Sequence, residues 1–229
     1  MKHIALLTTL LLSASLQAVE KPYDYVFFEN SLMKGDYFYS QAKYTSPSWI
    51  KNARHHLPVA GSVAFTPGNS LELTYVSAPG GDWYSEIQYC PVRGNDFFRE
   101  PSTLSMQVRL RESMNAAALP NIAIRYADST YTQYLNLRNY LKDTRPGVWH
   151  PVSIPLEDFG LNAVNDTNIK KLAAVALRPG TADGNEYTIY LDDIELLPAS
   201  LPSVSALNAP VLQEAKAYER HIDIKWIPQ

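Results

Sequence analysis

The stretch Leu104-Ser105-Met106-Gln107-Val108-Arg109-Leu110-Arg111 decides the fold class, because apolar and polar residues alternate along it without a break. Successive side chains of a β-strand point to opposite faces, so this period of two predicts a strand with one buried and one wetted face. The stretches Trp83–Tyr89 and Ile122–Ala127 alternate in the same way. The sequence therefore predicts half-buried antiparallel strands rather than helices.

Further segments rich in β-branched and aromatic residues continue the series: Val26–Glu29, Leu71–Val76, Tyr131–Arg138, Trp149–Ile154, Leu172–Arg178 and Tyr187–Leu196. Proline, glycine, asparagine and aspartate residues punctuate the chain between them, as expected for short strands joined by turns. Strands of this length and spacing favour an all-β fold, built as an antiparallel two-sheet β-sandwich.

The composition excludes several classes of protein. The chain has 229 residues, of which 46% are hydrophobic, so it can form a packed core. Its 20 Lys and Arg residues are outnumbered by 23 Asp and Glu residues, which argues against a nucleic-acid partner because no basic excess remains to neutralise phosphates. The single cysteine, Cys90, excludes an internal disulfide framework and a zinc site built from cysteines.

Residues 1–18 have the three parts of a secretory signal peptide. Lys2 and His3 lie near the start, an apolar stretch runs from Ile4 to Leu12, and small residues follow up to Ala18. A buried N-terminal helix is the alternative. The apolar stretch is too short to cross a hydrocarbon layer of about 30 Å. We therefore expect no membrane span and an exported protein, periplasmic or extracellular, whose β-sandwich domain occupies residues 19–198.

A second unit is expected after the sandwich. Residues 199–210 are rich in Pro, Ser and Ala, which suits an extended linker. Within residues 211–229, Ile222, Ile224 and Trp226 alternate with polar residues and predict one strand. A lone strand cannot bury its apolar face. It is therefore either the first strand of a truncated second domain, which we favour, or a strand that docks on the sandwich.

Three segments, Pro79–Trp83, Gly147–Phe159 and Tyr187–Leu196, resemble in their order the jelly-roll, galactose-binding-like carbohydrate-binding modules of secreted bacterial polysaccharide-degrading proteins. The resemblance covers roughly residues 25–198 and implies a jelly-roll sandwich that binds polysaccharide. The tail Ala209–Pro228 is similar to the opening strand of a fibronectin type III domain. Together these resemblances imply that the module serves a larger protein whose catalytic domain lies downstream.

Alternation along the strands also predicts a polar sheet face. If the apolar residues point inward, the expected ligand-binding residues on the other side are Tyr84, Glu86, Gln88, Gln107, Arg109, Arg125, Tyr134 and Asn136. Sugar hydroxyls need such donors and acceptors, and planar side chains suit their apolar C–H faces. Arg109 and Arg125 would favour an acidic sugar. The alternative is an ordinary solvated sheet face on which Glu86 pairs with one of these arginines.

Two tryptophans offer a choice between ligand contact and core. Trp83 follows Gly80-Gly81-Asp82, so it is a candidate platform for stacking on a sugar ring, with a place in the core as the alternative. Trp149 lies inside an apolar strand, and we expect it in the core.

The resemblance further implies a structural Ca²⁺ ion between the first and last strands, with Glu29 and Asp193 as ligands, because carboxylate oxygens suit calcium. The alternative is that backbone N–H groups or water satisfy both carboxylates. No other cofactor is expected.

Taken together, the residues and the resemblance favour an exported, non-catalytic carbohydrate-binding module that targets a larger glycan-degrading protein to polysaccharide. The sequence lacks Gly-x-Ser-x-Gly, His-Glu-x-x-His and Gly-rich phosphate-loop motifs. Two alternatives remain open: a glycoside hydrolase or polysaccharide lyase on a jelly-roll scaffold, with Glu86 and a tyrosine transferring protons, and a structural interdomain module.

Overall fold

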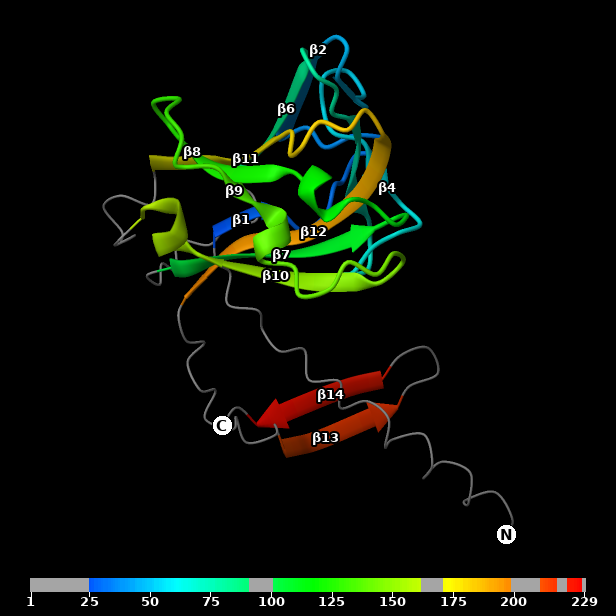
Figure 1. The fold of residues 1–229 in the computed structure, drawn as a ribbon. Coiled ribbons are helices and arrows are strands. Elements are labelled where there is room, and N and C mark those ends of the chain that lie inside the picture. Colours follow the sequence, from blue (N-terminus) through cyan, green and yellow to red (C-terminus); the bar gives the residue numbers. More distant parts are fainter. Residues whose placement is uncertain (1–24, 91–100, 162–170, 199–210, 218–221, 228–229) are drawn as a thin grey trace.

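The computed structural model describes residues 25–90, 101–161, 171–198, 211–217 and 222–227 (Figure 1). The predicted signal peptide, residues 1–18, and the predicted linker, residues 199–210, lie outside these ranges and stay predictions. No helix within the described ranges is both long and apolar enough to cross a bilayer.

Residues 25–90, 101–161 and 171–198 fold into two antiparallel sheets. The larger sheet has the strand order β10 (Trp149–Pro155), β7 (Pro101–Leu110), β12 (Glu186–Pro198), β5 (Ser70–Val76) and β3 (Trp49–Ile50), with β1 (Tyr25–Phe28) paired to β12 and β4 (Val59–Ala60) paired to β5. The smaller sheet has the order β2 (Ser40–Thr45), β6 (Asp82–Gln88), β11 (Leu172–Arg178), β8 (Asn121–Tyr126) and β9 (Leu135–Asn136). The predicted all-β sandwich is confirmed.

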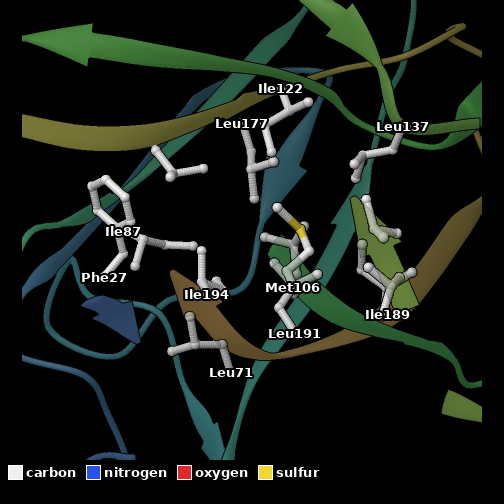
Figure 2. Packing of buried hydrophobic residues seen from close by; sticks show 14 of the residues in the cluster. Phe27, Leu71, Ile87, Met106, Ile122, Leu137, Leu177, Ile189, Leu191 and Ile194 are labelled. Carbon is white, nitrogen blue, oxygen red and sulfur yellow. The ribbon is translucent and has the colours of Figure 1, made fainter. Parts of the chain in front are cut away.

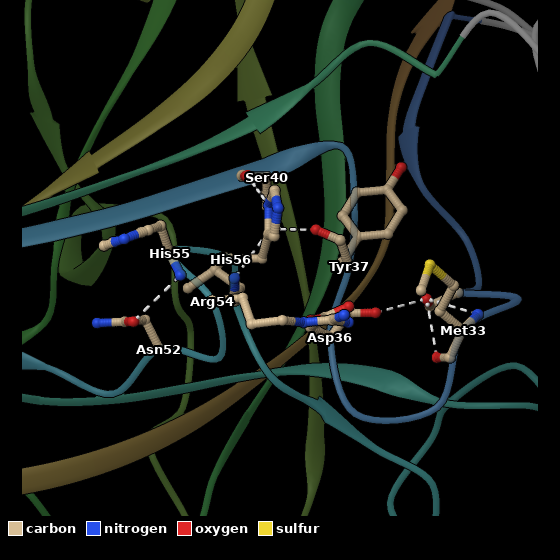
Figure 3. Close-up of polar contacts among 10 residues, drawn as sticks. Met33, Asp36, Tyr37, Ser40, Asn52, Arg54, His55 and His56 are labelled. Carbon is tan, nitrogen blue, oxygen red and sulfur yellow. Dashed lines mark hydrogen bonds and ion pairs between the residues drawn. The ribbon is translucent and has the colours of Figure 1, made fainter.

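The core lies between the two sheets, where the inward residues of the alternating strands meet. Leu104, Met106, Val108 and Leu110 of β7 are at most 1% exposed. Figure 2 shows Met106 and Ile122, from opposite sheets, pointing into the same layer. Burying one such side chain contributes roughly 1.5–3 kcal/mol, so the strict alternation of β7 commits it to this place in the sandwich.

The segment Tyr131–Arg138, predicted as a strand, is a strand only at Leu135–Asn136 and then turns into the short 3-10 helix η2 (Leu137–Asn139). The Asn136 side chain accepts a hydrogen bond from the backbone N–H of Arg138, and this local bond favours a turn over further pairing. Two other short 3-10 helices are η1 (Ala116–Ala118) and η3 (Leu156–Phe159). Strand β2 was not predicted from the sequence, because buried and exposed positions do not alternate along its last three residues, which are all exposed.

The C-terminal residues form a hairpin of β13 (Val211–Ala217) and β14 (Ile222–Ile227). One strand was predicted here, but the structure has two. Val211–Ala217 pairs with the predicted strand, although its own residues do not alternate regularly. The fibronectin type III assignment of this segment stays a prediction.

Candidate functional site

The outer face of the smaller sheet carries a dense group of polar and aromatic side chains. Along β6, Trp83, Ser85 and Ile87 are buried against the core, while Tyr84, Glu86 and Gln88 take the outward positions, as predicted. The registers Ala174↔Gln88 and Ala174↔Arg125 place Gln88, Ala174 and Arg125 in one row across β6, β11 and β8. Gln88 is half-buried at one end of this row.

Gln107 and Arg109 do not belong to this face. Both lie on β7, which pairs with β10 and β12 in the larger sheet, and their outward side chains point away from the smaller sheet. The expectation that all the predicted ligand-binding residues share one surface is therefore wrong for this pair. Alternation reports which side of its own strand a residue occupies, but it does not say which sheet the strand joins.

Glu86 lies at the centre of the face and is only 4% exposed. Its Oε1 atom accepts a hydrogen bond of 2.8 Å from the hydroxyl of Tyr131. The Nε atom of Arg125 lies 3.0 Å from the same oxygen, an ion pair whose N–H does not point squarely at its acceptor. A buried carboxylate is costly without compensation, so these two partners hold Glu86 in place.

Small side chains make this arrangement possible. Glu86 on β6 reaches partners on and beyond β8, and strand β11 lies between them. The outward residues there are Ala174 and Ala176, with Ala123 beside them on β8, and all three are almost fully covered. Larger residues at these positions would fill the space that the Glu86, Arg125 and Tyr131 side chains occupy.

The ionisation of Tyr131 agrees with this role. Burial, and then the hydrogen bond to Glu86, raise the pKa of Tyr131 to about 12. The hydroxyl therefore keeps its proton at any physiological pH and remains a donor to Glu86.

A second cluster lies on the same face around Arg178, the last residue of β11. Its Nη1 atom donates to the carboxylate of Asp82 at 2.6 Å, and its Nε atom donates to the hydroxyl of Tyr134 at 3.4 Å. The guanidinium carbon lies 5.5 Å from the ring centroid of Tyr84, within cation–π range. Lys43 lies 5.8 Å from the same ring. These contacts hold the ring of Tyr84 against the sheet.

The two clusters meet at the stacked rings of Tyr131 and Tyr134, whose centroids are 6.0 Å apart at an interplanar angle of 28°. Each of these tyrosines is 38% exposed, so part of each ring faces solvent. We call the set Tyr84, Glu86, Arg125, Tyr131, Tyr134 and Arg178 the tyrosine–arginine face. It combines partly exposed aromatic rings with donors and acceptors whose positions other side chains hold.

The segment that supplies Tyr131 and Tyr134 is tied to a distant part of the chain. Gln133 donates a hydrogen bond to the backbone carbonyl of Asp158 in η3, and Tyr140 donates to the Asp158 carboxylate at 2.8 Å. Asn136, predicted to bind ligand, instead uses its amide as scaffold, because Nδ2 donates to Leu119 and Asn121 while its oxygen accepts from Arg138.

Trp83 does not reach this face. It is 1% exposed, its ring lies 4.8 Å from that of Tyr75, and its indole N–H donates to the hydroxyl of Ser77 at 2.9 Å. The expectation of an exposed stacking platform is wrong, and the core alternative is confirmed. The same parity that placed Tyr84 outward places its neighbour Trp83 inward.

Sequence reasoning missed Tyr131 and Arg178. The sequence could have indicated Arg178, because it follows Ala174 and Ala176 at steps of two residues in the predicted strand Leu172–Arg178 and therefore points to the same side of that strand. No such indication exists for Tyr131, because this residue lies in the loop before the short strand β9, where side chains do not alternate.

The predicted calcium ligands lie next to the same strand pair but are an incomplete set. Strand β1 pairs with β12 at Phe28↔Ile194, and Glu29 and Asp193 are the chain neighbours of that last pair. Asp193 accepts a hydrogen bond from the hydroxyl of Thr66 at 2.8 Å. Within the described ranges, no group of three or more His, Cys, Asp or Glu side chains could hold a metal ion. Calcium takes six to eight oxygens, so two carboxylates would need backbone and water oxygens as well. The calcium site stays a prediction.

Comparison with known proteins adds a family to this geometry. The profile described as Carbohydrate binding domain 30 matches residues 24–197. Among solved structures, the chain is similar to the family 30 carbohydrate-binding module of a cellulosomal cellulase from Clostridium thermocellum, with 16% identity, a TM-score of 0.55, and coverage of 78% of this chain and 99% of that one. Another solved family 30 module has 18% identity and a TM-score of 0.52, over 82% of this chain and 96% of that one. At such identities the structural likeness concerns the fold.

Proposed function

The chain belongs to the carbohydrate-binding domain 30 family, and from this premise we propose that its tyrosine–arginine face binds the sugar rings of a neutral polysaccharide. Membership makes the sandwich a non-catalytic carbohydrate-binding module, and the resemblance to jelly-roll carbohydrate-binding modules is confirmed. The location of the binding face and the kind of sugar go beyond family membership and are what we propose.

The chemistry of the face carries this proposal. A pyranose ring offers apolar C–H surfaces, which pack on aromatic rings, and hydroxyl groups, which need both donors and acceptors. Tyr84, Tyr131 and Tyr134 supply the rings within one sheet face, and the last two are 38% exposed. Because Arg178 and Glu86 hold the tyrosines in place, little side-chain entropy is lost when a sugar binds.

Charge compensation favours a neutral sugar. Arg125 is paired with Glu86 at 3.0 Å, and Arg178 is paired with Asp82 at 2.6 Å. Neither arginine therefore retains a free charge that would demand a carboxylate from the ligand. This differs from the acidic sugar that Arg125 suggested in the sequence alone.

The enzyme alternative finds little support at Glu86. A general acid or base must reach the substrate, whereas Glu86 is 4% exposed and its carboxylate is engaged by Tyr131 and Arg125. Its position suits a role in holding the face together.

We further propose that the module is exported through residues 1–18 and delivers a larger glycan-degrading protein to its substrate. The hairpin β13–β14 supports a downstream domain, because two strands alone are marginally stable and need further strands to cover them. A fibronectin type III domain is the proposed identity of that unit.

The binding face can be tested by affinity gel electrophoresis of the chain from residue 19. The gels would contain hydroxyethylcellulose, mixed-linkage β-glucan, xylan or galactomannan. We expect retention on at least one of these neutral polysaccharides. Tyr134→Ala should weaken that retention by roughly three- to tenfold, the value of one aromatic contact of about 0.5–1.5 kcal/mol.

Tyr44→Ala is the matched control. Tyr44 is an exposed tyrosine of the neighbouring strand β2, but it pairs with Trp83, whereas Lys43 pairs with Tyr84, so Tyr44 does not share the outward side of Lys43. The variant should leave retention unchanged. Equal mobility of Tyr134→Ala and the parent chain on a retained glycan would show that the face is wrong. No retention on any neutral glycan would count against the proposed ligand class.

A further inference from the structure

The outer face of the larger sheet carries a second group of aromatic and basic side chains, on the opposite side of the sandwich from the tyrosine–arginine face. The registers Trp149↔Arg109 and Arg109↔Tyr190 place these three residues in one row across β10, β7 and β12. Their chain neighbours His150, Val108 and Ile189 are buried, so the row itself points outward. Trp149, expected in the core, is thus a partly exposed residue of a sheet face.

A loop adds a second ring to this row. Phe65 is 50% exposed, and its ring lies 6.1 Å from that of Trp149 at an angle of 70°. The backbone N–H groups of Phe65 and Thr66 donate to the carboxylate of Asp192, at 2.7 and 3.3 Å. Asp192 is fully buried and lies opposite Gln107 in the same sheet. The loop that presents Phe65 is therefore fastened to the face on which Trp149 lies.

Arg109 is the unsatisfied group of this row. Its Nε atom is buried and has no hydrogen-bond partner, and the guanidinium forms no ion pair within the described ranges. The next acidic residue along the row, Glu72, is already paired with Lys51 at 2.5 Å. No carboxylate within the described ranges compensates the charge of Arg109, and the residue as a whole is only half-buried, so its terminal guanidinium nitrogens can pair with a carboxylate that a ligand brings.

We propose that Phe65, Trp149 and Arg109 form a second carbohydrate site, which binds a sugar that carries a carboxylate. The aromatic pair contacts the C–H face of the ring, and the guanidinium forks onto the carboxylate, a pairing that Arg geometry favours. The difference from the first face is electrostatic, because both arginines there are compensated and Arg109 is not. This site rests on family membership and not on the tyrosine–arginine face. A chain with both sites could hold a neutral and an acidic polysaccharide at once.

The test uses the chain from residue 19 on gels that contain polygalacturonate or alginate, with hydroxyethylcellulose and mixed-linkage β-glucan as neutral probes. We expect the parent chain to be retained by at least one acidic polymer. Arg109→Gln, which keeps hydrogen-bond donors and removes the charge, should lower that retention about tenfold, as expected for a charge-assisted hydrogen bond. Phe65→Ala should lower it by roughly threefold, and 0.5 M NaCl should weaken it.

Tyr134→Ala is the matched control on the opposite face, and thermal melting checks that each variant is folded. It should leave retention on the acidic polymers unchanged, while Arg109→Gln and Phe65→Ala should leave retention on any neutral glycan unchanged. The inference is overturned if the parent chain is retained by neither acidic polymer, or if both variants are retained like the parent. It is also overturned if Tyr134→Ala, and not Arg109→Gln, abolishes acidic retention. Failure of neutral binding alone would overturn only the first site.

Discussion

Replacing Arg125 with Gln should destabilise the fold through the carboxylate that it leaves behind. The side chains of Arg125 and Glu86 are 15% and 6% exposed, and their charged atoms are 3.0 Å apart. At an effective dielectric constant of about 20, that distance corresponds to an attraction of about 5 kcal/mol. Desolvation offsets much of it, but removing one partner of a buried pair costs about 3–5 kcal/mol. We expect the lower end, about 3 kcal/mol, because Tyr131 still donates to Glu86.

A double-mutant cycle measures the coupling between Arg125 and Glu86 directly. Glu86→Gln removes the charge that Arg125 compensates, so the double variant Glu86→Gln/Arg125→Gln should be less destabilised than the sum of the single variants by about 2 kcal/mol. Urea unfolding, followed by circular dichroism at pH 7, gives the four free energies. Affinity electrophoresis on a retained neutral glycan, run in parallel, should show weaker binding for Arg125→Gln, since Arg125 no longer holds the Glu86 carboxylate to which Tyr131 donates.

Additive effects, with a coupling below about 0.5 kcal/mol, would refute this account of the tyrosine–arginine face. Such a result would mean that the pair is effectively screened by solvent and that Glu86 needs no compensation. The network would then be an ordinary surface ion pair, worth about 0–1 kcal/mol.

Further predictions concern Asp192, a glycine and calcium. Burial raises the pKa of Asp192 to about 6 from 3.8. This group therefore stabilises the fold below pH 4 and loses that contribution as the pH rises through 6. The unfolding free energy of the parent chain, compared with that of Asp192→Asn, should fall by roughly 2 kcal/mol between pH 4 and 7, and a difference that does not change with pH would contradict this. Gly180→Ala should destabilise by more than about 2 kcal/mol in urea unfolding, because a Cβ there would lie 2.2 Å from the Leu119 carbonyl oxygen. Gly61→Ala, in open space, should be neutral, and equal effects of the two would refute the packing argument. If calcium is bound at the edge of β1 and β12, EDTA should lower the melting temperature, and an unchanged temperature removes the metal.

Local sequence determined the strands and the two sides of each one. The alternation from Trp83 to Gln88 placed Tyr84 and Glu86 outward in advance, because a period of two is a property of the extended backbone itself. The same holds for Arg109 on β7. These assignments needed no knowledge of the neighbouring strands.

Tertiary structure alone decided which of these side chains share a surface. Arg125 joins Glu86 because β8 and β6 both flank β11, whereas Arg109, with the same parity and charge, faces the other way in the larger sheet. Tyr131 and Phe65 reach their faces from loops, where no periodicity exists. The physical reason is that backbone hydrogen bonds are alike for every strand, so contacts between residues far apart in the chain select the pairing.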